Sequence, residues 1–247
     1  MSGSTVLLLL PAAIIVIYAS RLILGFCAVR RRKRDLLAWA ETNHLSFSGE
    51  PYYGLDDDHP TFRHLQGGAG SFADNLLEGK WRGRAFQAFD FHCIKAVEVD
   101  ENHDMADRFA AILLSAVIRR GLGRNFSAII LESDVPLKPL SIRAEGASDR
   151  LADFLGFDEI KFESAEFSRE FHVKSADRKW AYDVLNPRAM EFLLSMPRFE
   201  IQFDEKAIMV HRSRTFSAQD FEAAAKVAQG LLDGLPEYVK EDEQARA

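Results

Sequence analysis

The chain begins with a long apolar run that differs from everything after it. Residues 5–29 read TVLLLLPAAIIVIYASRLILGFCAV and contain a single charged residue, Arg21. As a helix rising 1.5 Å per residue, this run would extend about 37 Å, and the hydrocarbon core of a bilayer is about 30 Å thick. The pattern predicts one transmembrane helix, preceded by a short extracytoplasmic tail at residues 1–4. A cleaved signal peptide fits less well, because no basic residue precedes the apolar run.

Arg21 divides this run, because a charge at the centre of a bilayer costs at least about 2.5–3.5 kcal/mol. In one interpretation the membrane span is 5–20, and residues 22–29 lie along the interface. In another, Arg21 extends toward the cytoplasmic headgroups. A third interpretation pairs Arg21 with another membrane protein.

Five consecutive basic residues follow the apolar run. We call them the basic collar (residues 30–34); they are Arg30, Arg31, Arg32, Lys33 and Arg34. Because cationic residues stay on the cytoplasmic side, the collar predicts a single-pass protein of the plasma (inner) membrane with its C-terminal domain in the cytoplasm. The collar is also expected to attract anionic lipid headgroups, and a topology signal without lipid recognition is the alternative.

The remaining chain, 35–238, alternates between strand-like and helix-like patterns, and 239–247 is predicted to be a frayed tail. Alternating runs on either side of Arg82-Gly83 predict a β-hairpin within 75–91. Further strands are expected at 126–132 and 139–143, and hairpins at 160–163 with 167–173 and at 199–203 with 207–211. Helices are expected at 35–45, 148–155, 175–185 and 188–195, and a last helix is expected to begin at Ser217 with Asp220 completing its cap. Residues 46–71 have the composition of a loop.

These patterns predict an α+β fold with antiparallel hairpins interleaved with helices, behind one N-terminal transmembrane helix. A strongly apolar helix at 105–119 leaves two interpretations open. It covers the sheet, or it lies on the membrane with Arg119, Arg120 and Arg124 at the headgroups. These three arginines and Arg21 are therefore the predicted membrane or partner contacts outside the collar.

Charge and cysteine content narrow the class of partner. The chain holds 31 basic and 37 acidic residues, and six of the basic ones lie before residue 35, so the remainder is strongly acidic. An acidic domain argues against nucleic acid as a partner, because phosphate binding needs a basic surface. The chain has two cysteines, Cys27 and Cys93, which are too far apart in sequence to form a CxxC site. So few cysteines are typical of a protein in a reducing compartment.

No stretch of the sequence carries a recognisable catalytic, cofactor or metal motif. Residues 56–59 (DDDH) lack the glycine and glutamate of a calcium loop and are expected to form a solvated turn. His92 and Cys93 are neighbours on a predicted strand, so they point to opposite faces and cannot act as base and nucleophile. GxSxG, HExxH and kinase motifs are absent from the sequence. We therefore predict no catalytic residue, no cofactor and no metal ligand, and an enzyme is the less favoured class.

Three blocks of sequence carry a resemblance: GSFADNLLEGKWRGRAFQAFDF (70–91), IKFESAEFSREFHV (160–173) and LNPRAMEFLL (185–194). In this order, behind the apolar run, the chain resembles a broad group of uncharacterised bacterial membrane-anchored proteins. The resemblance implies a bacterial inner or plasma membrane setting and brings no catalytic residues with it.

The predicted function is a membrane-tethered cytoplasmic interaction or scaffold module. Its expected partners are anionic lipid headgroups at the basic collar and a further membrane protein. One alternative is a membrane-associated enzyme acting on a small-molecule or lipid-proximal substrate. Another is an accessory subunit of a larger membrane complex, with Arg21 and helix 105–119 as contacts.

Overall fold

The structure is a computed structural model that describes residues 3–66, 70–93, 124–145 and 159–239. Within these ranges the side chains of 3–19, 22, 23 and 124 are not described. The predicted helices at 105–119 and 148–155, with Arg119 and Arg120, lie outside the described residues, as does 240–247 of the predicted tail. Of Arg124 and of most of the predicted membrane span, the backbone is described but the side chains are not. A search of the described residues finds no helix long and apolar enough to cross a membrane.

The described residues form one antiparallel sheet with helices packed against it, which confirms the α+β class. The nine strands lie in the order β1-β2-β3-β4-β9-β8-β5-β7-β6. Their bounds are β1 Ser46–Ser48, β2 Phe72–Trp81, β3 Arg84–Cys93, β4 Arg124–Glu132, β5 Leu140–Ala144, β6 Glu159–Ile160, β7 Phe171–Ser175, β8 Glu200–Phe203 and β9 Ala207–Arg212.

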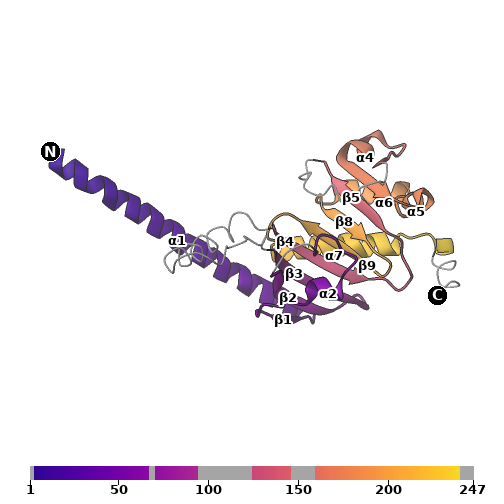
Figure 1. Cartoon of the computed structure of the whole chain (residues 1–247), viewed down its shortest axis with the longest axis horizontal. Coiled ribbons are helices and arrows are strands. Elements are labelled where there is room, and N and C mark those ends of the chain that lie inside the picture. Colours follow the sequence, from indigo (N-terminus) through magenta and orange to yellow (C-terminus); the bar gives the residue numbers. More distant parts are fainter. Residues whose placement is uncertain (1–2, 67–69, 94–123, 146–158, 240–247) are drawn as a thin grey trace, which may run out of the picture.

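The helices differ greatly in length. The first, α1, is continuous over 40 residues, Gly3–Thr42. It projects from the domain as a long rod, and its C-terminal turns pack beside the sheet (Figure 1). The others are α2 Leu55–Asp58, α4 Ala165–Glu170, α5 Arg178–Val184, α6 Pro187–Ser195 and α7 Ala218–Asp233.

The larger hydrophobic core lies between one face of the sheet and helices α1, α5, α6 and α7. At its centre the ring of Trp39 on α1 lies 6.1 Å from the ring of Phe221 on α7 and 5.9 Å from the ring of Trp81 on β2. Leu36 and Ala40 are buried beside it, whereas Leu37 is 42% exposed. The last turns of α1 are therefore part of the domain, and they account for most of the helix expected at 35–45.

A smaller core lies on the opposite face of the sheet. It is covered by residues 55–66, which we call the cover, and the sequence did not predict this role for them. Leu55, Phe62 and Leu65 are each 1% exposed and pack over side chains of β3, β4 and β9. They belong to the stretch 46–71 that was expected to be a loop, which instead contains β1 and α2. Its apolar residues follow no strand or helix period, so the periodicity argument could not identify them.

Two of the predicted hairpins and the last helix cap are confirmed. Arg82 and Gly83 have φ values of 49° and 96° and connect β2 to β3, as a type I′ turn requires. β8 pairs with β9 around the predicted turn. At the start of α7 the Ser217 side chain accepts from the Asp220 N–H, and the Asp220 carboxylate accepts from the Ser217 N–H.

The predicted hairpin of 160–163 with 167–173 is wrong in both arms. Ser164 accepts a hydrogen bond from Phe167 N–H and caps the short helix α4, which occupies 167–170 of the predicted second strand, so that β7 begins only at Phe171. The first strand is reduced to the two residues of β6, which pair with β7. The next helix, expected at 175–185, begins later, because the Asp177 carboxylate accepts from Trp180 N–H and caps α5.

The packing of α1 predicts that Trp39→Ala destabilises the domain and Leu37→Ala does not. Removing a buried tryptophan costs about 3–5 kcal/mol, whereas an exposed position changes stability by less than about 0.5 kcal/mol. Urea unfolding of the full chain in detergent, followed by tryptophan-independent far-UV circular dichroism, measures both. Equal losses in the two variants would contradict this docking of α1.

Candidate functional site

The site of interest is the junction where α1 enters the domain, because the basic collar lies there. Arg30, Arg31, Lys33 and Arg34 are exposed on the helix, and Arg21 is exposed further along it. The guanidinium of Arg30 lies 4.3 Å from the centre of the Phe26 ring.

Arg32 differs from the other four members of the collar. Its Nη1 and Nη2 donate to Asp90 Oδ2 at 2.7 Å and Oδ1 at 2.9 Å, and its Nε donates to the carbonyl oxygen of Phe216 at 2.6 Å. Such a bidentate pair fixes direction as well as distance. Arg32 was predicted to lie at the membrane surface with the rest of the collar. In the structure its side chain binds the domain instead.

A sequence signal for this contact was present. Arg32, Leu36 and Trp39 are spaced i, i+4 and i+7, so they lie on one face of α1, the face that packs on the domain. Five consecutive cations obscured the signal, since nothing in the collar alone distinguishes the middle residue.

Asp90, which receives Arg32, is a buried carboxylate with several further donors. It is 5% exposed and also accepts from Asn75 Nδ2 at 2.9 Å and from the Ser127 hydroxyl. The Ser127 oxygen in turn accepts from Phe216 N–H at 2.8 Å. Asn75 has φ 48° and lies in a register shift of β2. The hydrogen bonds around the Asp90 carboxylate of β3 thus connect three further parts of the chain: the irregular strand β2, β4 and the segment before α7.

His92 lies beside this network on β3. Its Nδ1 is 2.8 Å from Asn125 Oδ1, its Nε2 is 3.2 Å from Asp74 Oδ1, and its ring stacks on Phe72 at 4.8 Å. The hydrogen bond to the Asp74 carboxylate raises the pKa of His92 above 6.5, although partial burial opposes this. Cys93 is buried in the smaller core and makes no site with His92.

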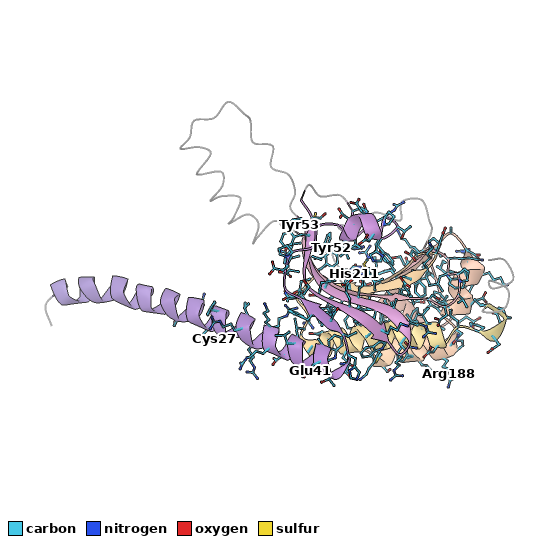
Figure 2. All side chains as sticks on the ribbon, turned by 90° about the horizontal axis from the view of Figure 1, so that it is seen from below. Cys27, Glu41, Tyr52, Tyr53, Arg188 and His211 are labelled. Carbon is cyan, nitrogen blue, oxygen red and sulfur yellow. The ribbon has the colours of Figure 1, made fainter. Side chains whose placement is uncertain are left out.

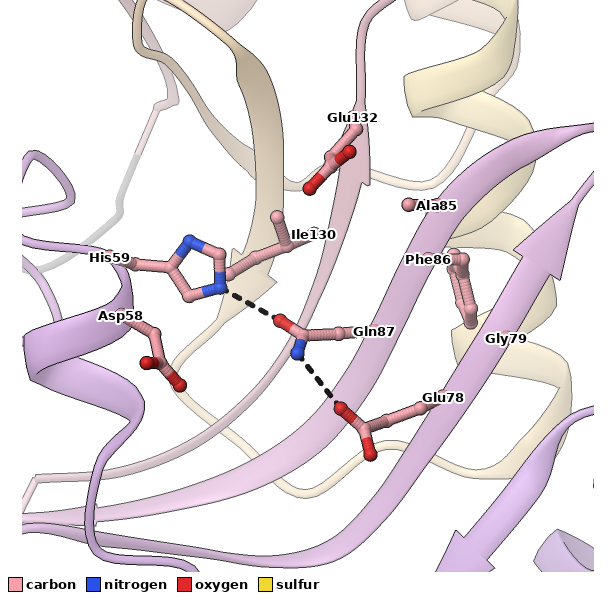
Figure 3. A pocket seen from close by; sticks show the side chains of 9 residues that line it. All are labelled: Asp58, His59, Glu78, Gly79, Ala85, Phe86, Gln87, Ile130 and Glu132. Carbon is pink, nitrogen blue, oxygen red and sulfur yellow. Dashed lines mark hydrogen bonds between the residues drawn. The ribbon is translucent and has the colours of Figure 1, made fainter.

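A separate cavity of about 380 Å³ lies where α2 approaches β2, β3 and β4 (Figure 3). Figure 3 shows a chain of side chains across it: His59 Nε2 is 2.7 Å from Gln87 Oε1, and Gln87 Nε2 donates to Glu78 Oε1 at 3.0 Å. Its lining holds Asp58 and Glu132 and no Ser, Cys or Lys among the described residues. Its volume is near the lower end of small-molecule sites.

One group among the described residues has the geometry of a metal site. His64, Glu200 and His211 place ligand atoms within 4.8 Å of one another. The sequence contained no sign of it, because His64 is distant in the chain and the two strand residues carry no ligand spacing. Burial is the largest effect on the pKa of His211, which it lowers well below 6.5, and burial raises the pKa of Glu200.

Comparisons with known proteins give a likeness of fold. No protein-family model matches the chain, and no curated protein matches it. Among solved structures it is similar to the crystal structure of the mycobacterial trehalose monomycolate transport factor A, TtfA. That match has a TM-score of 0.54 and 16% sequence identity, and covers 84% of this chain and 97% of that chain.

The Arg32–Asp90 pair predicts that Arg32→Met lowers the free energy of unfolding by about 3 kcal/mol. Removing one partner of a buried pair leaves the other charge uncompensated, and the loss falls at the lower end of the usual range because the Arg32 side chain is 23% exposed. Arg31→Met, an exposed neighbour, is the matched control. Urea unfolding measures both, and adding Asp90→Asn to Arg32→Met should recover part of the loss.

The environment of His92 predicts a stability that falls as pH rises above about 6.5. A histidine whose pKa is raised on folding contributes fully below its unfolded pKa of 6.5, and the contribution is lost through the folded pKa. His172, whose pKa is raised chiefly by Glu159, acts with the same sign. Unfolding free energies across this range should show a reduced slope in His92→Gln. An unchanged slope in His92→Gln would show that His92 gains no charged partner on folding.

Proposed function

We propose that this protein is a membrane-tethered accessory factor that serves lipid transport at a bacterial inner membrane. In this proposal the N-terminal part of α1 spans the membrane, and the α+β domain binds a membrane-protein partner on the cytoplasmic side. The observation that carries it is the continuity of α1, one helix from Gly3 to Thr42 whose end lies in the core of the domain.

The described part of α1 outside the domain supports a lipid environment. Leu24, Phe26 and Val29 are 68%, 58% and 68% exposed. They lie on different sides of the helix, and a helix that is apolar all round is typical of a membrane span or a buried core. A bilayer would cover these side chains, which the domain does not.

The collar supports an orientation close to the membrane. Arg34 and the buried Leu36 are two residues apart, so about 3 Å of helix separates the collar from the core. Four of its residues are exposed and can reach headgroups, while Arg32 binds the domain. The acidic remainder of the domain is repelled by an anionic leaflet, so the collar is the expected lipid contact.

The lipid-transport part of the proposal rests on the likeness to the transport factor. That protein is named for trehalose monomycolate transport, and the similarity extends over nearly all of its chain. An accessory role also agrees with the lack of catalytic motifs in the sequence. Lipid transport is carried over as a class, without the particular lipid that the other protein's name gives.

An enzyme acting on a small molecule is the second candidate, and the cavity in Figure 3 is the observation that favours it. His59 and Glu132 would be its acid–base groups. In that case His59→Gln should abolish ligand-induced thermal stabilisation in a metabolite screen, and a screen without any stabilising compound would remove this candidate.

Reversing the four exposed cations of the collar tests the tether. Vesicles containing anionic lipid should bind the variant with Arg30, Arg31, Lys33 and Arg34 changed to Glu much more weakly than the native chain, and its topology by protease protection should become mixed. The control reverses four exposed cations elsewhere, Lys161, Arg178, Arg188 and Lys206. Figure 2 shows Arg188 at the end of the domain opposite Cys27 on α1. Equal behaviour of the two variants would overturn the role of the collar.

Site-specific crosslinking in native membranes tests the accessory role. A photoreactive residue at Tyr53, which is 66% exposed, should capture one discrete membrane protein, and deleting the gene should impair export of an envelope lipid. A tethered domain with unaltered lipid export and no crosslinked product at Tyr53, Tyr182 or Tyr238 would contradict the proposal.

A further inference from the structure

We propose that His64, Glu200 and His211 bind one divalent first-row transition metal ion, with Zn²⁺ as the reference ion. The site lies on the sheet face that carries the smaller core, opposite the face on which α1 docks. This inference does not depend on the membrane role of the protein.

The strand register brings two of the ligands together. Glu200 on β8 and His211 on β9 are paired residues, so their side chains leave the same face of the sheet at neighbouring positions. His211 is buried, and Figure 2 places its label over the sheet. Apolar residues Met209 and Ala207 precede His211 on that face, so the cluster marks where the smaller core becomes polar.

The third ligand comes from the segment that covers this face. His64 Nε2 is 3.9 Å from Glu200 Oε2, and the rings of His64 and His211 are 4.1 Å apart between centres. All three ligand atoms lie within 4.8 Å of one another. In a tetrahedral zinc site with bonds of about 2.0–2.1 Å, ligand atoms are about 3.4 Å apart, so small side-chain rotations close the site.

His211 gives an independent reason to expect a ligand. It is 1% exposed, and neither ring nitrogen has a hydrogen-bond partner among the described residues. Buried polar atoms nearly always have partners, so an unpartnered imidazole inside a polar cluster indicates a missing one. Its low pKa keeps the ring neutral, which is the form that binds a metal.

The surroundings have the features of an outer shell. Gln202 lies two residues along β8 from Glu200, and its amide nitrogen faces His64 Nδ1. With its amide oxygen turned to that nitrogen, Gln202 would accept the Nδ1 proton and leave Nε2 for the metal. Phe126 packs against both histidine rings, at 6.2 and 5.4 Å. Arg143 favours the ionised form of Glu200, which burial opposes, and it also offsets the carboxylate charge when no cation is bound.

The donor set defines the ion and its consequence. Two imidazoles and one carboxylate suit Zn²⁺, Co²⁺, Fe²⁺ and Mn²⁺ better than Ca²⁺ or Mg²⁺, and three protein ligands leave a fourth position for water. His64 lies in segment 59–66, which covers this face, whereas Glu200 and His211 lie on β8 and β9. A bound ion would therefore hold segment 59–66 against these two strands.

Metal titration of the full chain tests this. The chain is purified in detergent, stripped with a chelator and titrated with Zn²⁺ by calorimetry and with Co²⁺ by visible absorption. One equivalent should bind, with the ligand-field bands of a low-symmetry Co²⁺ site and a higher melting temperature. Glu200→Gln keeps the shape of the side chain but removes its charge. This variant and His64→Gln should each lower the affinity for Zn²⁺ by about 100-fold or more, since losing an outer-shell partner alone lowers metal affinity by about 10–100-fold.

His172→Gln is the matched control. His172 also lies between two carboxylates, but its Nδ1 faces Glu159 at 2.6 Å and its Nε2 faces Glu145 at 2.5 Å, so the two acids lie on opposite sides of the ring and cannot share an ion with it. This variant should bind Zn²⁺ like the native chain. The proposal is overturned if the native chain shows no saturable binding, or if Glu200→Gln binds as tightly as His172→Gln does. Circular dichroism of each variant shows that it is folded.

Discussion

The carboxylate of Asp90 is the constraint on which the arrangement of the molecule depends. An ionised carboxylate out of water is costly unless donors surround it, and Asp90 is buried on β3, an interior strand of the sheet. The guanidinium that meets it comes from α1, a helix that would otherwise leave the domain near residue 35. The remaining donors come from a strand irregularity at Asn75 and from β4. One buried charge therefore fixes where the helix, the irregular strand and the segment before α7 meet.

The two faces of the sheet carry different structures. One face receives α1 and the other helices and holds the larger core, including the aromatic contacts of Trp39. The other face holds the smaller core and the cluster around His211, under a cover with little regular structure. The junction with α1 and the cluster of His64, Glu200 and His211 thus lie on opposite faces of the sheet, so a change in segment 55–66 need not disturb that junction.

Elements with local signals were predictable from sequence. The turn at Arg82-Gly83 and the cap at Ser217 depend on neighbouring residues, and both are confirmed. The parts that were missed depend on residues far apart in sequence. The partner of Arg32 is 58 residues away, and Glu200 meets His64 only through the strand register and the path of the cover. Ser164 was missed for another reason: a short capped helix can occupy a stretch whose alternation indicates a strand.

The unbroken path of α1 through the collar has a geometric consequence for how the domain presents itself. A helix turns by about 100° per residue, and α1 is unbroken from its N-terminal half to the Arg32–Asp90 pair. If the N-terminal half is held in a bilayer, the domain then has a fixed azimuth about the membrane normal, and the same side always faces a neighbour. One residue inserted just before Arg30 would swing that side by more than a quarter turn while leaving every contact within the domain intact.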